Sequence, residues 1–240
     1  MADLYSKVTL RPRSKLERII ELLQRATSVP KRPDSTVVVQ LVLYYLVSAE
    51  VSPSDASRLV KSFHDDLARI DPARLVEVEA ESVREACPER HLGDLVSALR
   101  ATGLAAREGL EELSRRDIDE AKRRIAQLPR MNAESVDLIL LSCGVASTVA
   151  PSAPARRVAC RIGYPGTTYA ALARALDAEI PEGDATDLAW RAHHVLAQHG
   201  RDICQLPRPQ CDRCAVRASC SYHGEGDDPA SRLSNPGIAG

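Results

Sequence analysis

Aromatic residues are scarce in this sequence, and long apolar runs are absent from it. Phe, Trp and Tyr together account for 3% of the 240 residues, too few for the base-stacking surface of a single-strand-binding protein. The longest apolar stretch, residues 37–47, is broken by Gln40 and falls short of the ~20 residues that a membrane-spanning helix needs. The sequence therefore predicts neither a single-strand binder nor a membrane protein.

An excess of either charge is also lacking. The formal net charge is -1, whereas strong nucleic-acid binders usually carry a surplus of Lys and Arg. Basic residues are nevertheless concentrated near the start of the chain, at Lys7, Arg11, Arg13, Lys15, Arg18, Arg25, Lys31 and Arg32. This stretch is either a solvated helix face or a locally cationic arm.

Four of the seven cysteines lie in one short segment with the spacing C-x6-C-x2-C-x5-C, namely Cys204, Cys211, Cys214 and Cys220. Such thiolates can converge on one inorganic centre, and either zinc or a 4Fe-4S cluster fits the spacing. Disulfides are the alternative, but they need an oxidising compartment, and the chain opens Met1-Ala2-Asp3-Leu4 without an apolar leader. We therefore expect metal ligation in a reducing cytoplasm, with Cys87, Cys143 and Cys160 as buried residues.

The residues before and within this segment resemble the C-terminal end of the endonuclease III family of helix-hairpin-helix DNA glycosylases. The similarity rests on the run from His193 to Cys204, including its His199-Gly200-Arg201 turn, and on all three cysteine intervals. Weaker similarity extends it over roughly residues 14–222. The resemblance implies a 4Fe-4S cluster on the four cysteines and a role related to base-excision repair.

Apolar residues recur at helical spacing almost throughout, which predicts an all-α protein. Ser14, Thr36 or Ser35, and Ser52-Pro53 have the residue types that begin helices. Further helices are expected to begin at Asp71 and Asp117 and to span about 79–86, 91–102, 133–142, 155–162, 168–178 and 185–199.

The resemblance implies two lobes with DNA between them. One is a six-helix barrel at 34–147 that contains the helix-hairpin-helix, and the other is an iron-sulfur lobe made from 1–33 and 148–222. Residues 223–240 are rich in Gly, Asp, Ser and Pro, which predicts a disordered tail.

The segment Leu128-Pro129-Arg130-Met131-Asn132 matches the family's hairpin, L-P-G-V-G, with both glycines replaced. Such a hairpin binds a phosphate through backbone N–H groups at a helix start. Arg130 either contacts the phosphate with its own guanidinium or is a surface residue of an altered turn. The DNA-binding residues that the resemblance implies are Pro129, Arg130, Met131 and Asn132, with Arg208 and Arg213 of the cysteine segment.

The positions that carry the family's chemistry hold other residues. Glu134 stands at the lysine position, and a carboxylate cannot form a Schiff base. Ser152 stands at the aspartate position, where a neutral hydroxyl cannot stabilise a cationic sugar. Glu50 stands near the wedge glutamine, and its charge is unfavourable beside DNA. The acids that remain as catalytic candidates are Glu134 and Asp137, one helical turn apart, unless both are simply solvated.

We therefore predict a cytoplasmic, nucleoid-associated monomer that binds double-stranded DNA, has no membrane partner and lacks the usual glycosylase and lyase chemistry. A monofunctional glycosylase that uses Glu134 or Asp137 to hydrolyse an N-glycosidic bond is the first alternative. A protein-interaction or redox-sensing module is the second, favoured by the neutral net charge.

Overall fold

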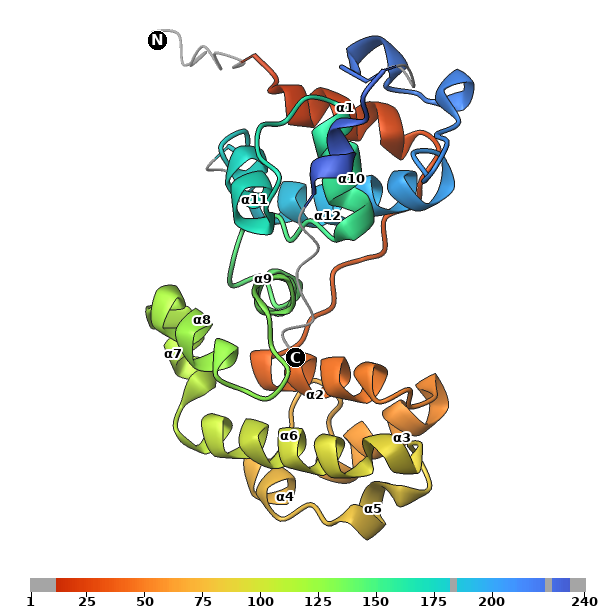
Figure 1. Cartoon of the computed structure of the whole chain (residues 1–240). Helices are drawn as coiled ribbons and strands as arrows, with labels where there is room; N and C mark the ends of the chain where they lie inside the picture. Colours follow the sequence, from red (N-terminus) through yellow and green to blue (C-terminus); the bar gives the residue numbers. More distant parts are fainter. Residues whose placement is uncertain (1–11, 182–184, 223–225, 234–240) are drawn as a thin grey trace, which may run out of the picture.

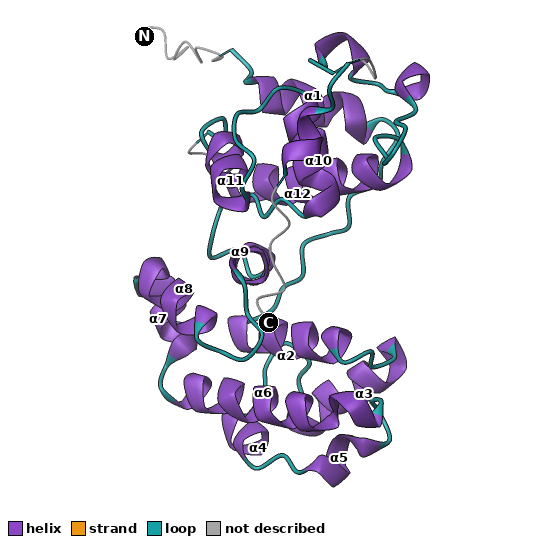
Figure 2. Cartoon of the chain, viewed as in Figure 1, coloured by secondary structure: helices purple, strands orange, loops and turns teal. Residues whose placement is uncertain are grey.

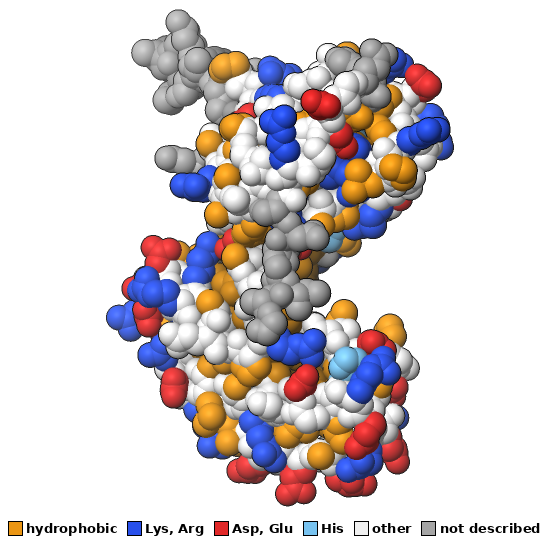
Figure 3. Space-filling model, viewed as in Figure 1, with side chains coloured by type: hydrophobic (Ala, Val, Ile, Leu, Met, Phe, Trp, Pro, Cys, Tyr) orange, Lys and Arg blue, Asp and Glu red, His pale blue; other side chains and the backbone are white. Residues whose placement is uncertain are grey.

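The computed structural model describes residues 12–181, 185–222 and 226–233, and these ranges contain helices and no strands. The predicted all-α class is confirmed. Figures 1 and 2 show two groups of helices, one above the other, with α9 (Ala133–Ser142) between them. On the same face, Figure 3 shows basic and acidic side chains interspersed over both groups. No described helix has both the length and the apolar character needed to cross a membrane.

The lower group in Figure 1 is organised around α2 (Val37–Ser48) and α6 (Glu89–Arg107). Because α2 packs against α3, α6, α7 and α9, its sequence is apolar nearly all round. The remaining helices of this group are α3 (Pro53–Phe63), α4 (Pro72–Val76), α5 (Ala80–Arg84), α7 (Leu110–Arg116) and α8 (Ile118–Ala126).

The upper group has α12 (Ala185–Asp202) at its centre, packed against α1 (Lys15–Gln24) and α10 (Ala153–Arg161). It also contains α11 (Tyr169–Asp177) and the short helices η1 (Cys211–Arg213), η2 (Arg217–Ser219) and η3 (Pro229–Arg232). Helix α1 comes from the far end of the chain, yet the Leu16 N–H donates to Glu179 Oε2 at 2.6 Å. The Trp190 indole likewise donates to the Pro30 carbonyl at 2.8 Å.

Helix α9 connects the two groups because it packs on both. Its buried Ile139 and Leu140 join the apolar cluster that contains Leu41 of α2, while Leu141 joins the cluster around α12. This arrangement places the start of α9, where the hairpin and Glu134 lie, next to both groups. The domain boundaries expected at 34, 147 and 222 stay a prediction.

The predicted helix starts are built as the sequence indicates. Ser14 accepts the Glu17 N–H at 3.2 Å and the Glu17 carboxylate accepts the Ser14 N–H, which forms a capping box. Thr36 and Ser52 cap α2 and α3 with their side chains.

Two features around α6 differ from the prediction. The helix was expected to end near Thr102, before a glycine, but it continues through Gly103 to Arg107. A Cβ on Gly103 would lie 2.8 Å from Val76 Cγ2, so this glycine allows α4 to approach α6 closely. The actual break is at Gly109, with φ 83, and it is followed by the unpredicted α7.

The disordered tail predicted at 223–240 stays a prediction. Within it, residues 226–233 contain η3, which packs on α10, and the Asp228 carboxylate pairs with the buried Arg161. A composition rich in small polar residues does not indicate such a specific buried partner. Residues 223–225 and 234–240 lie outside the described ranges.

Candidate functional site

The hairpin turn contains a left-handed residue although the glycines of the family's pattern are replaced. Arg130 has φ 58, in the left-handed region, which costs a non-glycine residue about 1–2 kcal/mol. Asn132 caps α9, accepting the Ser135 N–H at 2.9 Å while Ser135 Oγ accepts the Asn132 N–H. The Tyr45 hydroxyl donates to the Pro129 carbonyl at 2.8 Å and anchors the turn on α2. The start of α9 is therefore fixed and capped.

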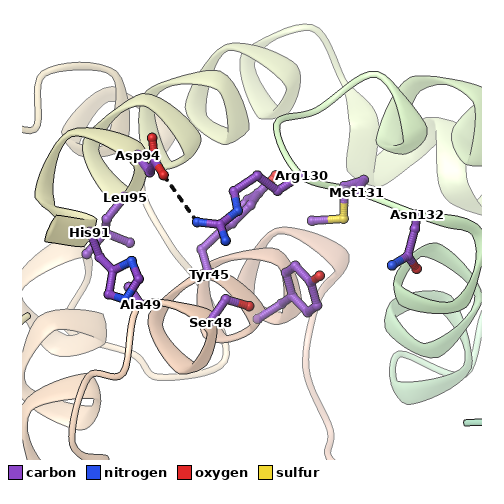
Figure 4. A pocket seen from close by; sticks show the side chains of 10 residues that line it. Tyr45, Ser48, Ala49, His91, Asp94, Leu95, Arg130, Met131 and Asn132 are labelled. Carbon is purple, nitrogen blue, oxygen red and sulfur yellow. Dashed lines mark hydrogen bonds and ion pairs between the residues drawn. The ribbon is translucent and has the colours of Figure 1, made fainter. Parts of the chain in front are cut away.

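The side chain of Arg130 lies over a hollow beside the hairpin. Its Nη1 donates to Asp94 Oδ2 of α6 at 3.2 Å, as Figure 4 shows. Met131 and Asn132 line the same hollow. The predicted DNA-binding residues of the hairpin are thus brought together with part of α6.

Glu50, near the wedge position, has two basic partners on α6. Its backbone is left-handed, with φ 59, and its carboxylate is paired with Arg90 and with His91 Nε2, the latter at 3.4 Å. The hydrogen bond from Arg90 lowers the pKa of Glu50 below its usual value, and His91 contributes in the same direction. The charge that sequence reasoning regarded as unfavourable beside DNA is therefore accompanied by basic partners.

Glu134 is half-buried at the start of α9, and its environment differs from that of a solvated carboxylate. Burial raises the pKa of Glu134 above its usual value, and the charge of the buried Arg156 on α10 opposes that rise. A carboxyl with a raised pKa is suited to proton transfer near neutral pH.

Asp137, by contrast, is occupied by two partners. Lys122 Nζ of α8 lies 2.8 Å from Asp137 Oδ1, and the Tyr169 hydroxyl of α11 donates to Oδ2 at 2.8 Å. Nearby, burial raises the pKa of Asp177 to about 6, although the Val149 N–H donates to it at 2.7 Å. These side chains join α8, α9 and α11 rather than presenting a reactive carboxylate.

Ser152 is at the start of α10, in the N-cap position, but makes no side-chain cap hydrogen bond. Its Oγ is buried and, among the described residues, has no hydrogen-bond partner. The hydroxyl lies where the resemblance expects an aspartate, and no acidic side chain of the described ranges pairs with it.

The four predicted ligands Cys204, Cys211, Cys214 and Cys220 line one small cavity together with Arg161 and Tyr222. Burial raises the pKa of the Cys214 thiol, and it does the same for Cys220. Within residues 12–181, 185–222 and 226–233, no three His, Cys, Asp or Glu side chains are arranged to hold a single metal ion.

Arg161 is the buried cation of this cavity. Its Nη1 donates to Cys204 Sγ at 3.3 Å and to the Gln205 carbonyl at 3.0 Å. Burial alone would lower the pKa of Arg161, but hydrogen bonds to Asp228 and Cys204 raise it above its usual value. Arg161 therefore connects η3 with the cysteine segment and stays charged.

The predicted arginines of the cysteine segment and the histidines of α12 lie in different environments. Arg208 and Arg213 are exposed on the cysteine segment. His193 Nδ1 lies 2.7 Å from the Ala150 carbonyl, and His199 Nε2 lies 3.5 Å from Cys214 Sγ. Burial lowers the pKa of His194 to about 4, so this histidine is neutral.

Sequence reasoning missed the residues that complete these sites, namely Asp94, Arg156, Arg161 and Tyr169. Charged residues are mostly exposed, so nothing in a single sequence marks Arg156 or Arg161 as buried. Asp94 and Tyr169 lie far in sequence from the residues they contact, and only the fold brings them together.

No family model matches the chain. Among curated proteins, an Endonuclease III of Sulfolobus acidocaldarius is 25% identical over 70% of this chain and 80% of its own length. The Endonuclease III of Rickettsia conorii is 32% identical over 41% of this chain, and the match spans 46% of that relative's length.

Solved structures show the same fold. A trapped Endonuclease III–DNA covalent intermediate has a TM-score of 0.60 with 16% identity, covering 87% of this chain and 95% of that one. A thermostable thymine-DNA glycosylase has a TM-score of 0.57 with 15% identity, covering 87% of this chain and 94% of that one. In sequence and in fold, the chain is therefore similar to endonuclease III-like members of the helix-hairpin-helix DNA glycosylase superfamily.

Proposed function

We propose that this protein binds double-stranded DNA through the α8–α9 hairpin, in a role related to base-excision repair, and carries a 4Fe-4S cluster on its four cysteines. We further propose that it lacks the usual glycosylase and lyase chemistry. The observation that carries the proposal is the contrast at the start of α9. The turn keeps its left-handed residue and its cap, while the position of the family's lysine holds Glu134.

Binding would use general features of a helix start. The first N–H groups of α9 and its dipole attract a phosphate, and the exposed Arg130 adds a guanidinium. On the cysteine segment, Arg208 and Arg213 are exposed and offer further phosphate contacts. Two of the solved structures similar in fold are complexes of Endonuclease III with DNA, which supports this mode of binding.

The four cysteines line one small cavity, and the resemblance of their spacing to that of the endonuclease III family favours a cluster over a zinc ion. A four-iron cluster binds each thiolate on a different iron, so its ligands are spread around a cavity, as Cys204, Cys211, Cys214 and Cys220 are. The cluster would contribute folding energy to this segment, and Arg161 would donate a hydrogen bond to Cys204 Sγ.

The geometry around the vacant catalytic positions supports the absence of lyase chemistry. Glu134 has no amine to offer a sugar aldehyde, and Ser152 has no charge. The amine of Lys122 approaches α9, but it is ion-paired with Asp137 at 2.8 Å.

A monofunctional glycosylase is the second candidate function, and the raised pKa of Glu134 favours it over a purely solvated carboxylate. In that reaction Glu134 would take a proton from water, the water oxygen would bond to the sugar C1′, and the base would leave. Glu134 is a better candidate than Asp137, because Lys122 and Tyr169 already occupy the Asp137 carboxylate.

One set of experiments tests these statements. Fluorescence anisotropy with undamaged and abasic-analogue duplexes should show binding that weakens steeply as salt rises, and purified protein should contain iron. Duplexes with deaminated, oxidised or alkylated bases should stay intact after alkali treatment. Free base released by the protein but not by a Glu134→Gln variant would establish the glycosylase instead.

A further inference from the structure

Residues 226–233 follow the last of the four cysteines and lie beyond the part of the chain that resembles the endonuclease III family. They nevertheless have a defined place in the upper group. Helix η3 packs on α10, and the side chains of Ala230 and Leu233 lie against the apolar cluster around α12. Asp228 caps η3, because its Oδ1 accepts the Ala230 N–H at 3.0 Å. The position of the Asp228 carboxylate is therefore set by its own helix.

The Asp228 carboxylate holds the guanidinium of Arg161 in one orientation. Arg161 Nε donates to Asp228 Oδ1 at 3.0 Å and Arg161 Nη2 donates to Oδ2, so the contact is bidentate. The Arg161 side chain is 1% exposed and that of Asp228 is 19% exposed, and salt screens a pair of this kind much less than an exposed one. Two of the three guanidinium nitrogens are thus committed to Asp228.

The third nitrogen, Nη1, is directed at the cysteine segment. It donates to Cys204 Sγ at 3.3 Å and to the Gln205 carbonyl at 3.0 Å. On its other side the guanidinium lies over the ring of Tyr222, 5.1 Å from the ring centroid, and the Arg161 carbonyl accepts the Tyr222 N–H at 3.0 Å. Because an Arg side chain stays protonated in proteins, these contacts keep a cation beside the Cys204 sulfur.

A cation next to a ligand sulfur affects the electron affinity of the centre that the sulfur binds. The reduction potential of an iron-sulfur cluster depends on the net charge around it and on hydrogen bonds to its sulfurs. An added electron makes the centre more negative, so the charge of Arg161 favours the reduced form and the charge of Asp228 opposes it. Both effects are strong here, because charges interact more strongly in a buried pair than at an exposed surface.

We propose that Asp228 is a positioning residue for the cluster, which directs Arg161 Nη1 at the Cys204 sulfur and adjusts, through its own charge, the potential at which the cluster accepts one electron. This inference rests on the proposed 4Fe-4S cluster. In this exchange one electron enters from a one-electron donor, which is the electrode in the test below, and no bond is made or broken. Residues 226–233 thus act on the cofactor through a single buried ion pair.

Voltammetry of the full chain with its cluster, adsorbed on an electrode, measures this potential. Asp228→Asn removes the negative charge but keeps an amide oxygen that accepts from Arg161, so we expect the potential to shift upward. Arg161→Gln removes the cation and should shift the potential downward. The matched control is Asp212→Asn, which removes the same charge from the cysteine segment itself. The Asp212 side chain is 94% exposed and pairs with Arg217, so this variant should keep the potential of the parent.

A merely structural role for Asp228 would lower stability and leave the potential unchanged. A potential in Asp228→Asn equal to that of the parent, or below it, would therefore overturn the inference, and so would a shift of equal size in Asp212→Asn. If Asp228→Asn does not retain iron, Arg161→Gln decides, and a potential at or above that of the parent overturns the inference. Parent protein purified without iron and sulfide would overturn the proposed cluster as well.

Discussion

Replacing Arg130 separates the backbone of the hairpin from its side chain. Arg130 has φ 58, a conformation that costs an L-residue about 1–2 kcal/mol but costs glycine nothing. Both Arg130→Gly and Arg130→Ala remove the contact with Asp94, so the difference between the two variants reports the backbone. Glycine also loses about 0.5–1 kcal/mol through the greater freedom of its unfolded chain. We expect the glycine variant to exceed the alanine variant in free energy of unfolding by about 0.5–1 kcal/mol.

Urea unfolding of both variants, followed by circular dichroism, measures this difference. The matched control is Arg123 in the interior of α8, also exposed and paired with Glu120. There the sign should reverse, because glycine costs a helix about 1 kcal/mol relative to alanine. In thermal unfolding, the expected gain at position 130 is about 1–4 °C for a chain of this size. An Arg130→Gly variant no more stable than Arg130→Ala would show that the left-handed turn is not required, and the proposed hairpin geometry would fail with it.

Three further outcomes are expected. Asp228→Asn should lower the free energy of unfolding by about 3 kcal/mol in urea titrations, since it removes the carboxylate that pairs with the buried Arg161 charge; an unchanged midpoint would mean that η3 adds nothing to the upper group. Borohydride treatment with abasic-site DNA should trap no covalent adduct, and an adduct that disappears in Lys122→Ala would reveal a displaced nucleophile. The pKa of Asp177 is raised from 3.8 to about 6 in the folded protein, so folding favours the protonated carboxyl. The stability that this preference adds is present at low pH and is lost as pH rises through 6. In Asp177→Asn, the free energy of unfolding should therefore decline less between about pH 4 and 7 than in the parent. Parallel stability profiles of the two proteins would contradict the raised pKa of Asp177.

Much of the fold could be predicted because its signals are local. Ser14, Thr36 and Ser52 cap helices where the sequence placed them, and a side-chain cap needs only its own helix. The sequence prediction ended α6 before Gly103, because glycine commonly follows the last residue of a helix. It also missed α7. In the structure Gly103 allows Leu75 and Val76 of α4 to approach closely, a contact between distant segments.

The candidate site was predictable only for residues with fixed spacing. The four cysteines were placed around one cavity by their intervals, and the hairpin by its match to the family. Asp94, Arg156 and Arg161 contribute through burial or through partners 36 to 67 residues away. No periodicity or motif in one sequence encodes those distances.

The origin of α1 at the other end of the chain has a consequence for how the molecule is made. During synthesis α1 leaves the ribosome before α10 and α12, against which its apolar side must eventually lie, have been translated. The helices from α2 to α8 are translated in the meantime. Helix α1 therefore gains its final neighbours late, and the apolar side chains of Leu16, Ile19 and Ile20 lack their buried partners until α10 and α12 have been made.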